Sequence, residues 1–230
     1  KSDKLLAEFF SEVLELAKSD IETILTLHNI ASDEVVFIVF HAGLGQDFSL
    51  PGLDPTIYDL KSAYIDEEMM SDVTPTEILG KPIQTGILLP ETQNMIYYDV
   101  VEDIFGNPDY GTDDLCDIQL GLTGIFAFLL GYELGLPPLF NPETGDPGVG
   151  FFGLMDHGSN NGRGVIPAPL SPWTRSLPSV EWSTIETISP IQSLDTTITV
   201  HALDSILYRI NISENEYFLI ENRNNWVDPE

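Results

Sequence analysis

Apolar residues recur at three- and four-residue spacing between Lys4 and His28, with polar side chains between them. This spacing puts the apolar side chains on one face of a helix, so it predicts an amphipathic helix packed on a core. A further helical turn at residues 21–27 is expected to continue it, within an N-terminal helical region of residues 1–30. The apolar positions are Leu5, Leu6, Phe9, Phe10, Val13, Leu14, Leu16 and Ala17.

Residues 35–40 form an uninterrupted β-branched and aromatic run, which is typical of a strand. Because the hydrophobicity is continuous and not alternating, we expect both faces to be buried, as in the centre of an α/β sheet. The strand is expected to end in a glycine-bearing loop at residues 41–47, where open α/β sheets commonly build sites. Residues 86–89 form a second candidate strand, and residues 97–104 a short helix or strand.

The run from Leu120 to Leu130 is also apolar, but it is shorter than the ~20 residues that a membrane span needs. It contains Gly121 and Gly124, and Glu133 follows closely. We therefore predict a buried core helix over residues 120–134.

The last third of the chain is predicted to be rich in strands. Prolines before Trp173 indicate a helix start there, because proline suits the first turn of a helix. Candidate strands follow at residues 196–203, 206–211 and 217–221. Helices with a mixed sheet and then a β-rich tail predict an α+β fold in one domain, with a core at residues 33–182 and a C-terminal part at residues 183–230.

The chain is strongly acidic, with 37 acidic and 9 basic side chains and a formal net charge of −28. Such a surface repels nucleic acid and anionic membranes, so polyanion partners are excluded. Two readings stay open: a merely soluble acidic surface, and a surface adapted to salt or Ca²⁺, which relieve self-repulsion.

Cysteine and the chain ends add little about function. The single Cys116 lies among aspartates that disfavour its thiolate, which argues against a nucleophilic role. No signal peptide is visible at Lys1. The chain begins in a helical pattern, so we expect it to be part of a longer polypeptide.

The end of the predicted central helix resembles the end of the active-site helix in zinc hydrolases. Such helices place two His residues at i and i+4, so that both imidazoles reach one metal, and a Glu beside the first His activates the bound water. Here the helix ends in Leu-Gly-Leu-Pro at residues 134–137.

Segments in register along residues 35–223 resemble the immune-inhibitor-A-type zinc metallopeptidases. They are residues 35–46, ending His-Ala-Gly-Leu-Gly-Gln; 134–137 with Leu139-Phe140; 150–155 with Gly158-Ser159; 169–173 with 180–182; and 217–223, Tyr-Phe-Leu-Ile-Glu-Asn-Arg. The resemblance implies a zincin-like α+β fold, in which the turn at Met155 lies under the metal.

Registered on this family, the zinc signature is lost. Phe128 stands where the first His ligand belongs, Leu129 at the general-base Glu, Tyr132 at the second His and Pro138 at the acidic third ligand. Phe, Leu and Pro cannot bind Zn²⁺, and a neutral phenol is a poor ligand alone. We expect Phe128 and Leu129 to fill the vacated pocket.

No other catalytic arrangement replaces the lost one in the sequence. Glu133 is expected to be a solvated or capping carboxylate. The sequence spacing of His41, Asp156 and His157 matches no pattern of metal ligands. Both histidines are therefore expected to be hydrogen-bonded structural residues. Ser159 lacks the Gly-x-Ser-x-Gly frame of a nucleophile elbow.

Calcium remains open, because two glycine-bearing loops gather oxygen donors of the kind that Ca²⁺ prefers. Neither loop has EF-hand spacing, and acidic turns are commonly just solvated. The candidate ligands are Asp109, Asp113, Asp114, Asn141, Glu143 and Asp146.

Together these observations predict a catalytically inactive metallopeptidase-like domain, without zinc or another cofactor unless Ca²⁺ binds. It would act as a structural or binding module of a secreted or cell-surface protein, with a protein partner and no membrane span. The alternatives are a divergent active metalloendopeptidase and a self-assembling surface or filament subunit.

Overall fold

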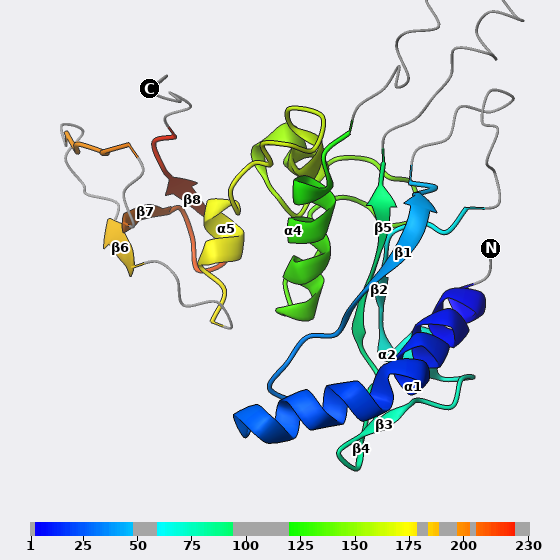
Figure 1. Cartoon of the computed structure of the whole chain (residues 1–230). Helices are drawn as coiled ribbons and strands as arrows, with labels where there is room; N and C mark the ends of the chain where they lie inside the picture. Colours follow the sequence, from blue (N-terminus) through cyan, green and yellow to red (C-terminus); the bar gives the residue numbers. More distant parts are fainter. Residues whose placement is uncertain are drawn as a thin grey trace, which may run out of the picture.

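The computed structural model describes residues 3–47, 59–93, 120–178, 184–188, 197–202 and 206–223, and these form a mixed α+β structure (Figure 1). The helices are α1 (Asp3–His28), α2 (Glu67–Met70), α4 (Leu122–Glu133) and α5 (Pro172–Arg175), with short 3-10 turns η1 (Gly150–Phe152) and η2 (His157–Asn160). The strands are β1 (Ile38–Leu44), β2 (Ala63–Ile65), β3 (Glu77–Ile78), β4 (Lys81–Pro82), β5 (Gly86–Thr92), β6 (Thr184–Ile188), β7 (Ile206–Asn211) and β8 (Tyr217–Ile220).

The first sheet is mixed, as predicted, and has the order β1-β5-β2. β1 pairs with β5 in parallel, with Ile38 opposite Ile87, and β2 pairs with β5 in the antiparallel direction, with Ala63 opposite Leu88. β5 therefore is the central strand of this sheet, and its first five residues are all buried.

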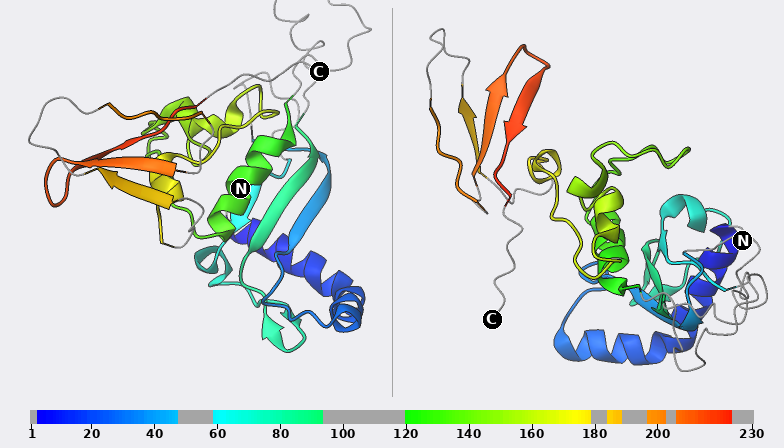
Figure 2. Two further views of the ribbon diagram at one scale, coloured as in Figure 1. Left: turned by 90° about the vertical axis from the view of Figure 1, so that its left-hand side faces the viewer. Right: turned by 90° about the horizontal axis from the view of Figure 1, so that it is seen from above.

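Side chains on these strands alternate between two apolar clusters, because successive strand residues point to opposite faces. Leu88 of β5, Val39 of β1 and Ile65 of β2 pack with α1. Ile87 and Leu89 of β5 pack with α4 instead. The sheet thus lies between two helices, with α1 on one face and α4 on the other (Figures 1 and 2).

The amphipathic helix predicted for the N-terminus is confirmed as α1. Its buried residues include Leu6, Phe10 and Leu14, which recur at four-residue spacing and face the sheet. The ring of Phe10 lies where a side chain at Gly86 would be, since a Cβ there would stand 2.2 Å from Phe10 Cζ. The glycine at the start of β5 therefore allows α1 to approach the strand closely.

The sequence-based prediction for β1 is wrong in two respects. The strand spans Ile38–Leu44 and not residues 35–40, so the segment from His41 to Leu44 belongs to the strand and not to a loop. β1 is also at one side of the described sheet, and Phe40 is exposed. Continuous burial on both faces belongs to β5, the middle strand of this sheet, which packs against α1 on one face and against α4 on the other.

The second sheet has the order β6-β7-β8, with β6 parallel and β8 antiparallel to β7. It confirms the candidate strands at residues 206–211 and 217–221. The candidate strand at residues 196–203 is not formed in its described part, residues 197–202, where only Ala202 makes a bridge, with Asn222. Residues 97–104 lie outside the described residues.

This second sheet lies on the side of α4 away from the first sheet, and α5 stands between (Figure 1). α5 begins at Pro172, next to the predicted Trp173, and the Ser171 hydroxyl caps it by accepting from Thr174 N–H. Glu221, beyond β8, pairs with Arg175 of α5 and with Arg223. In the described part of the chain no helix is long and apolar enough to cross a membrane.

Candidate functional site

The central helix α4 is held at its N-terminus by the loop at residues 159–164. Gly121 N–H donates to the Arg163 carbonyl at 2.7 Å, and Gly124 N–H donates to the Gly164 carbonyl at 2.8 Å. These carbonyls take up N–H groups that a helix start leaves unpaired. A Cβ at Gly124 would stand 1.8 Å from the Ser159 carbonyl oxygen, so the loop can dock only against a glycine.

The C-terminus of α4 forms a Schellman turn. Leu136 N–H donates to the Gly131 carbonyl and Gly135 N–H to the Tyr132 carbonyl, both at 2.9 Å. Gly135 has φ +75°, a conformation that glycine adopts without steric cost. The turn directs the chain back along the helix, where Leu139 N–H donates to the Met155 carbonyl.

Met155 lies directly against α4. Its side chain has no exposed area, and its Sδ would be 2.4 Å from a Cβ at Gly131. Leu136 and Leu170 complete this buried cluster. The Met-turn-like residue singled out in the sequence is therefore a packing residue beneath the central helix.

The four residues that the sequence comparison set against the zinc signature have different environments. Phe128 and Tyr132 pack edge to face, with ring centroids 4.8 Å apart, and Tyr132 also stacks on Tyr64. Leu129 points to the sheet and is buried with Ile87 and Leu89. Pro138 is half-buried in the segment after the Schellman turn. Burial raises the pKa of the Tyr132 phenol, which keeps it neutral.

A cleft of about 640 Å³ lies beside the first half of α4. Its apolar lining residues are Leu120, Ile125, Phe128 and Phe140, and its polar ones include Asp47, Gln93, Asp156, His157, Asn160 and Arg163. Phe128 lines this cleft without closing it, and Leu129 does not face it. Of the two residues expected to fill the pocket, Phe128 packs with Tyr132 against the Met155 cluster, and Leu129 packs on the sheet.

Asp156 anchors the loop on one side of the cleft. It is only 2% exposed, and its carboxylate accepts from the backbone N–H groups of Gly148, Val149, Gly150 and His157 at 2.7–2.9 Å. Burial acts to raise the pKa of this carboxyl, but the four donors outweigh it and lower the pKa. Asp156 thus has a structural role as a charged acceptor.

Asp47 has a similar role on the opposite side, and sequence reasoning did not single it out. Its carboxylate accepts from Ser62 N–H at 2.7 Å, from the Ser62 hydroxyl and from Gln93 Nε2. It thereby joins the segments that follow β1, precede β2 and follow β5. The only available signal was its place in a loop after a predicted strand, because its partners are distant in sequence.

The two histidines are separated by the sheet. His41 lies two residues after Val39 and so on the α1 face, whereas the cleft adjoins α4 on the other face. His157 lines the cleft, and its Nε2 lies 3.2 Å from the Gly145 carbonyl. The structure therefore does not bring His41 together with His157 and Asp156.

Glu133 differs from the expected solvated or capping carboxylate. It is half-buried and accepts from the Thr85 hydroxyl at 3.3 Å. Burial, together with the charge of this nearby carboxylate, raises the pKa of Tyr64 to about 12. Glu133 thus belongs to a polar contact between α4 and the sheet.

The described calcium candidates lie in one turn with internal hydrogen bonds. Asn141 Oδ1 accepts from Glu143 N–H at 2.9 Å and from Thr144 N–H at 3.3 Å, and the Thr144 hydroxyl donates to Asp146. This is a self-capped turn. Asp109, Asp113 and Asp114 lie outside the described residues. Within the described ranges, no three His, Cys, Asp or Glu side chains gather as a metal site would require.

Comparison with known proteins adds no relative. No protein-family model, curated protein or solved structure matches the chain.

Proposed function

We propose that this chain is a catalytically inactive member of the immune-inhibitor-A-type metallopeptidases, with a zincin-like fold, and that it acts as a binding module. The observation that carries the proposal is the aromatic pair on α4, of which Phe128 lines the cleft and Tyr132 packs against the Met155 cluster. Phe128 and Tyr132 occupy the two ligand positions of the family signature, one helical turn apart, and pack ring against ring. The cleft beside them is open to about 640 Å³.

The surroundings of α4 support the family frame. In that frame a glycine lets the chain turn back after the helix, and Gly135 makes such a turn here. A Met turn lies under the metal position in the family, and Met155 packs under Gly131 here. Both contacts agree with a zincin-like fold, and here both serve packing.

Zinc does not fit these residues. The side chains of Phe128, Leu129 and Pro138 carry no donor atom, and the Tyr132 phenol is kept neutral by burial. A bound Zn²⁺ needs at least three protein ligands in a catalytic site. We therefore derive no hydrolytic step for this chain.

The cleft suits binding better than chemistry. Its two carboxylates, Asp47 and Asp156, accept three and four hydrogen bonds from protein donors, which gives them a structural role. An apolar wall with a few polar groups at its edge is the usual make-up of a binding pocket. The acidic surface agrees with a secreted or cell-surface protein in a medium that contains salt or Ca²⁺.

Metal content and hydrolysis test the loss of activity directly. Protein purified without chelator is expected to carry zinc well below one equivalent and to leave a casein substrate uncut. Stoichiometric zinc, together with hydrolysis that a chelator abolishes, would establish the active metalloendopeptidase instead.

Restoring the ligands tests the family register. The triple variant Phe128→His, Tyr132→His, Pro138→Asp should bind Co²⁺ at least about tenfold more tightly than a pair of histidines alone, because a third ligand is added. The control Leu16→His, Asp20→His puts a histidine pair at the same spacing on the exposed face of α1. Equal Co²⁺ affinity in the two variants would show that the register is wrong.

A further inference from the structure

A second groove, of about 620 Å³, lies between α5 and the turn that joins β7 to β8. It is independent of the α4 cleft, because no lining residue is shared between the two. Its apolar lining residues are Val149, Pro172 and Trp173 on one side and Ile212, Tyr217 and Leu219 on the other.

Exposed apolar side chains from separate segments converge on this groove. Val149 is 39% exposed, Trp173 40% and Ile212 58%. Isolated exposed apolar residues are ordinary on protein surfaces. Their convergence on one concave surface is not, and it is the usual mark of an interaction site.

The aromatic residues of the groove are held in place before any partner arrives. The Arg209 guanidinium lies 3.9 Å from the ring centroid of Tyr217 and covers one of its faces. Trp173 is in the first turn of α5, which the Ser171 cap fixes. Rigid aromatic side chains lose little conformational entropy on binding, which favours them as anchors.

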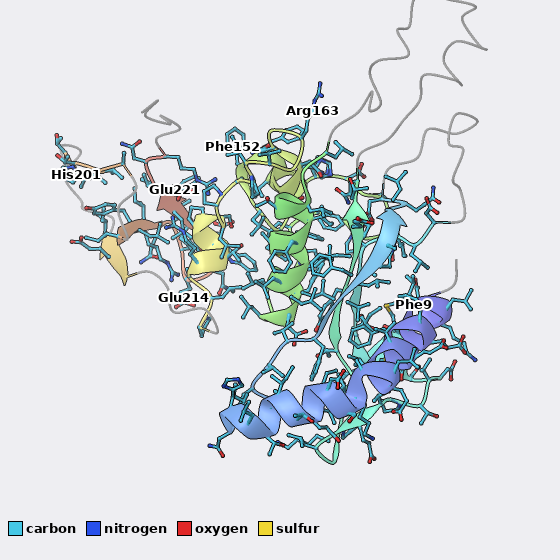
Figure 3. The ribbon with its side chains drawn as sticks, viewed as in Figure 1. Phe9, Phe152, Arg163, His201, Glu214 and Glu221 are labelled. Carbon is cyan, nitrogen blue, oxygen red and sulfur yellow. The ribbon has the colours of Figure 1, made fainter. Side chains whose placement is uncertain are left out.

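Charge identifies the class of partner. Glu216 lines the groove, Glu214 lies on the same turn (Figure 3), and no Lys or Arg is among its described lining residues. A second copy of the chain would bring another −28 surface against this one. Like charges in contact are costly, whereas a basic segment is attracted.

Most of the lining is apolar, and the polar residues among it are Ser171, Asn215 and Glu216. Val149, Pro172, Ile212 and Leu219 offer no side-chain hydrogen bonds to hydroxyl groups, but they accommodate apolar side chains. We propose that this groove binds an extended peptide segment of a partner protein, with apolar side chains held against Trp173 and flanking Lys or Arg residues near Glu216. This site does not depend on the proposed loss of peptidase activity.

Fluorescence anisotropy with the full chain tests the proposal. The probe is a fluorescein-labelled peptide with a Leu-Pro-Leu core flanked by arginines; matched peptides carry glutamates at the flanks or serines in the core. Only the first is expected to bind with a measurable Kd. The Trp173→Ala variant should raise that Kd about tenfold, as loss of a central aromatic anchor commonly does.

The chain offers matched controls for both parts of the proposal. Phe218 is a 62% exposed aromatic residue on β8 that does not line the groove, so Phe218→Ala should leave the Kd unchanged. Glu216→Lys should weaken binding more than Glu214→Lys, which makes the same charge change outside the groove. If Trp173→Ala lowers the melting temperature, Ile212→Ser replaces it as the groove variant.

Several results would overturn the proposal. They are equal binding of the leucine-core and serine-core peptides, equal effects of Trp173→Ala and Phe218→Ala, and displacement of the probe by a neutral cello-oligosaccharide at comparable concentration. The last result would assign the groove to carbohydrate.

Discussion

The two sheets of this protein are stabilised by different means. In the first sheet, β5 is buried on both faces, between α1 and α4, and belongs to two apolar clusters. In the second sheet, most described side chains of β7 and β8 are only half-buried, and Leu207 belongs to none of the three apolar clusters. Its best-defined links to the rest of the molecule are polar, through Arg175, Glu221 and Arg223.

The comparison indicates where the protein can change without unfolding. A strand enclosed by two apolar layers cannot lose volume cheaply, because interiors are close-packed. A sheet attached by ion pairs at one edge keeps its outer surface available. The second groove accordingly lies between the second sheet and α5.

The largest expected effect comes from truncating the same residue type in each sheet. Leu88 and Leu207 both have no exposed area, and each is on the middle strand of its described sheet. Leu88→Ala should lower the free energy of unfolding by about 3–5 kcal/mol, and Leu207→Ala by about 2 kcal/mol, because fewer neighbours lose contact there. Urea unfolding measures both, and equal losses would contradict the contrast between the sheets.

Asp156→Asn is expected to cost at least about 2 kcal/mol, because an amide cannot accept from all four backbone donors. The pKa of Asp156 is lowered in the folded state, so its contribution is full above the unfolded pKa of about 3.8 and is lost as pH falls through the folded value. The wild-type protein should therefore lose stability in acid more steeply than the variant. Denaturant unfolding at several pH values measures this, and an equal loss of stability in acid for the two proteins would rule out this role.

Glu221→Gln should weaken the attachment of the second sheet. Its ion pairs are partly buried, with side-chain exposures of 18–20%. The free energy of unfolding is therefore expected to fall by about 1–2 kcal/mol, an amount between those typical of exposed and of buried ion pairs. Amide hydrogen exchange should increase in β6–β8 and stay unchanged in β5. Increased exchange in β5 as well would mean that the two sheets unfold as one unit.

The smallest effect is expected from Tyr64→Phe, within about 1 kcal/mol at neutral pH. The pKa of Tyr64 is raised to about 12, so the phenol stays protonated in the folded protein while it ionises in the unfolded chain near pH 10. Stability should fall between about pH 10 and 12 in the wild type and less in the variant. Ultraviolet titration of the folded protein should also lose its highest-pH tyrosine, and retention of that step would contradict the assignment.

Local pattern explains the elements that were predicted correctly. The periodicity of α1 and the apolar run of α4 follow from residues three and four apart, which meet on one helix face. The strands β7 and β8 are rich in β-branched and aromatic residues, and β5 contains a short continuous apolar run, both of which favour strands. The positions of Phe128, Leu129 and Tyr132 on α4 followed from the same spacing.

Partners distant in sequence explain what was missed. A buried run such as residues 35–40 cannot reveal whether its strand is central or at one side, because that depends on where β5 and β2 pair. Asp47 receives its donors from Ser62 and Gln93, which no local spacing connects. Tertiary packing also placed Phe128 and Tyr132 against Met155, whereas the orientation of α4 turns Leu129 to the sheet.

The sequence by itself determined that Phe128, Leu129 and Pro138 cannot be zinc ligands, since no fold can supply a donor atom to their side chains. It also determined the acidic surface and the helical face of α1. Only the tertiary structure decided that the α4 cleft is open, that His41 and His157 are on opposite faces of the sheet, and that Trp173 meets Ile212 in a groove. The physical reason is that chemistry resides in single residues, whereas clefts and contacts arise where distant segments pack.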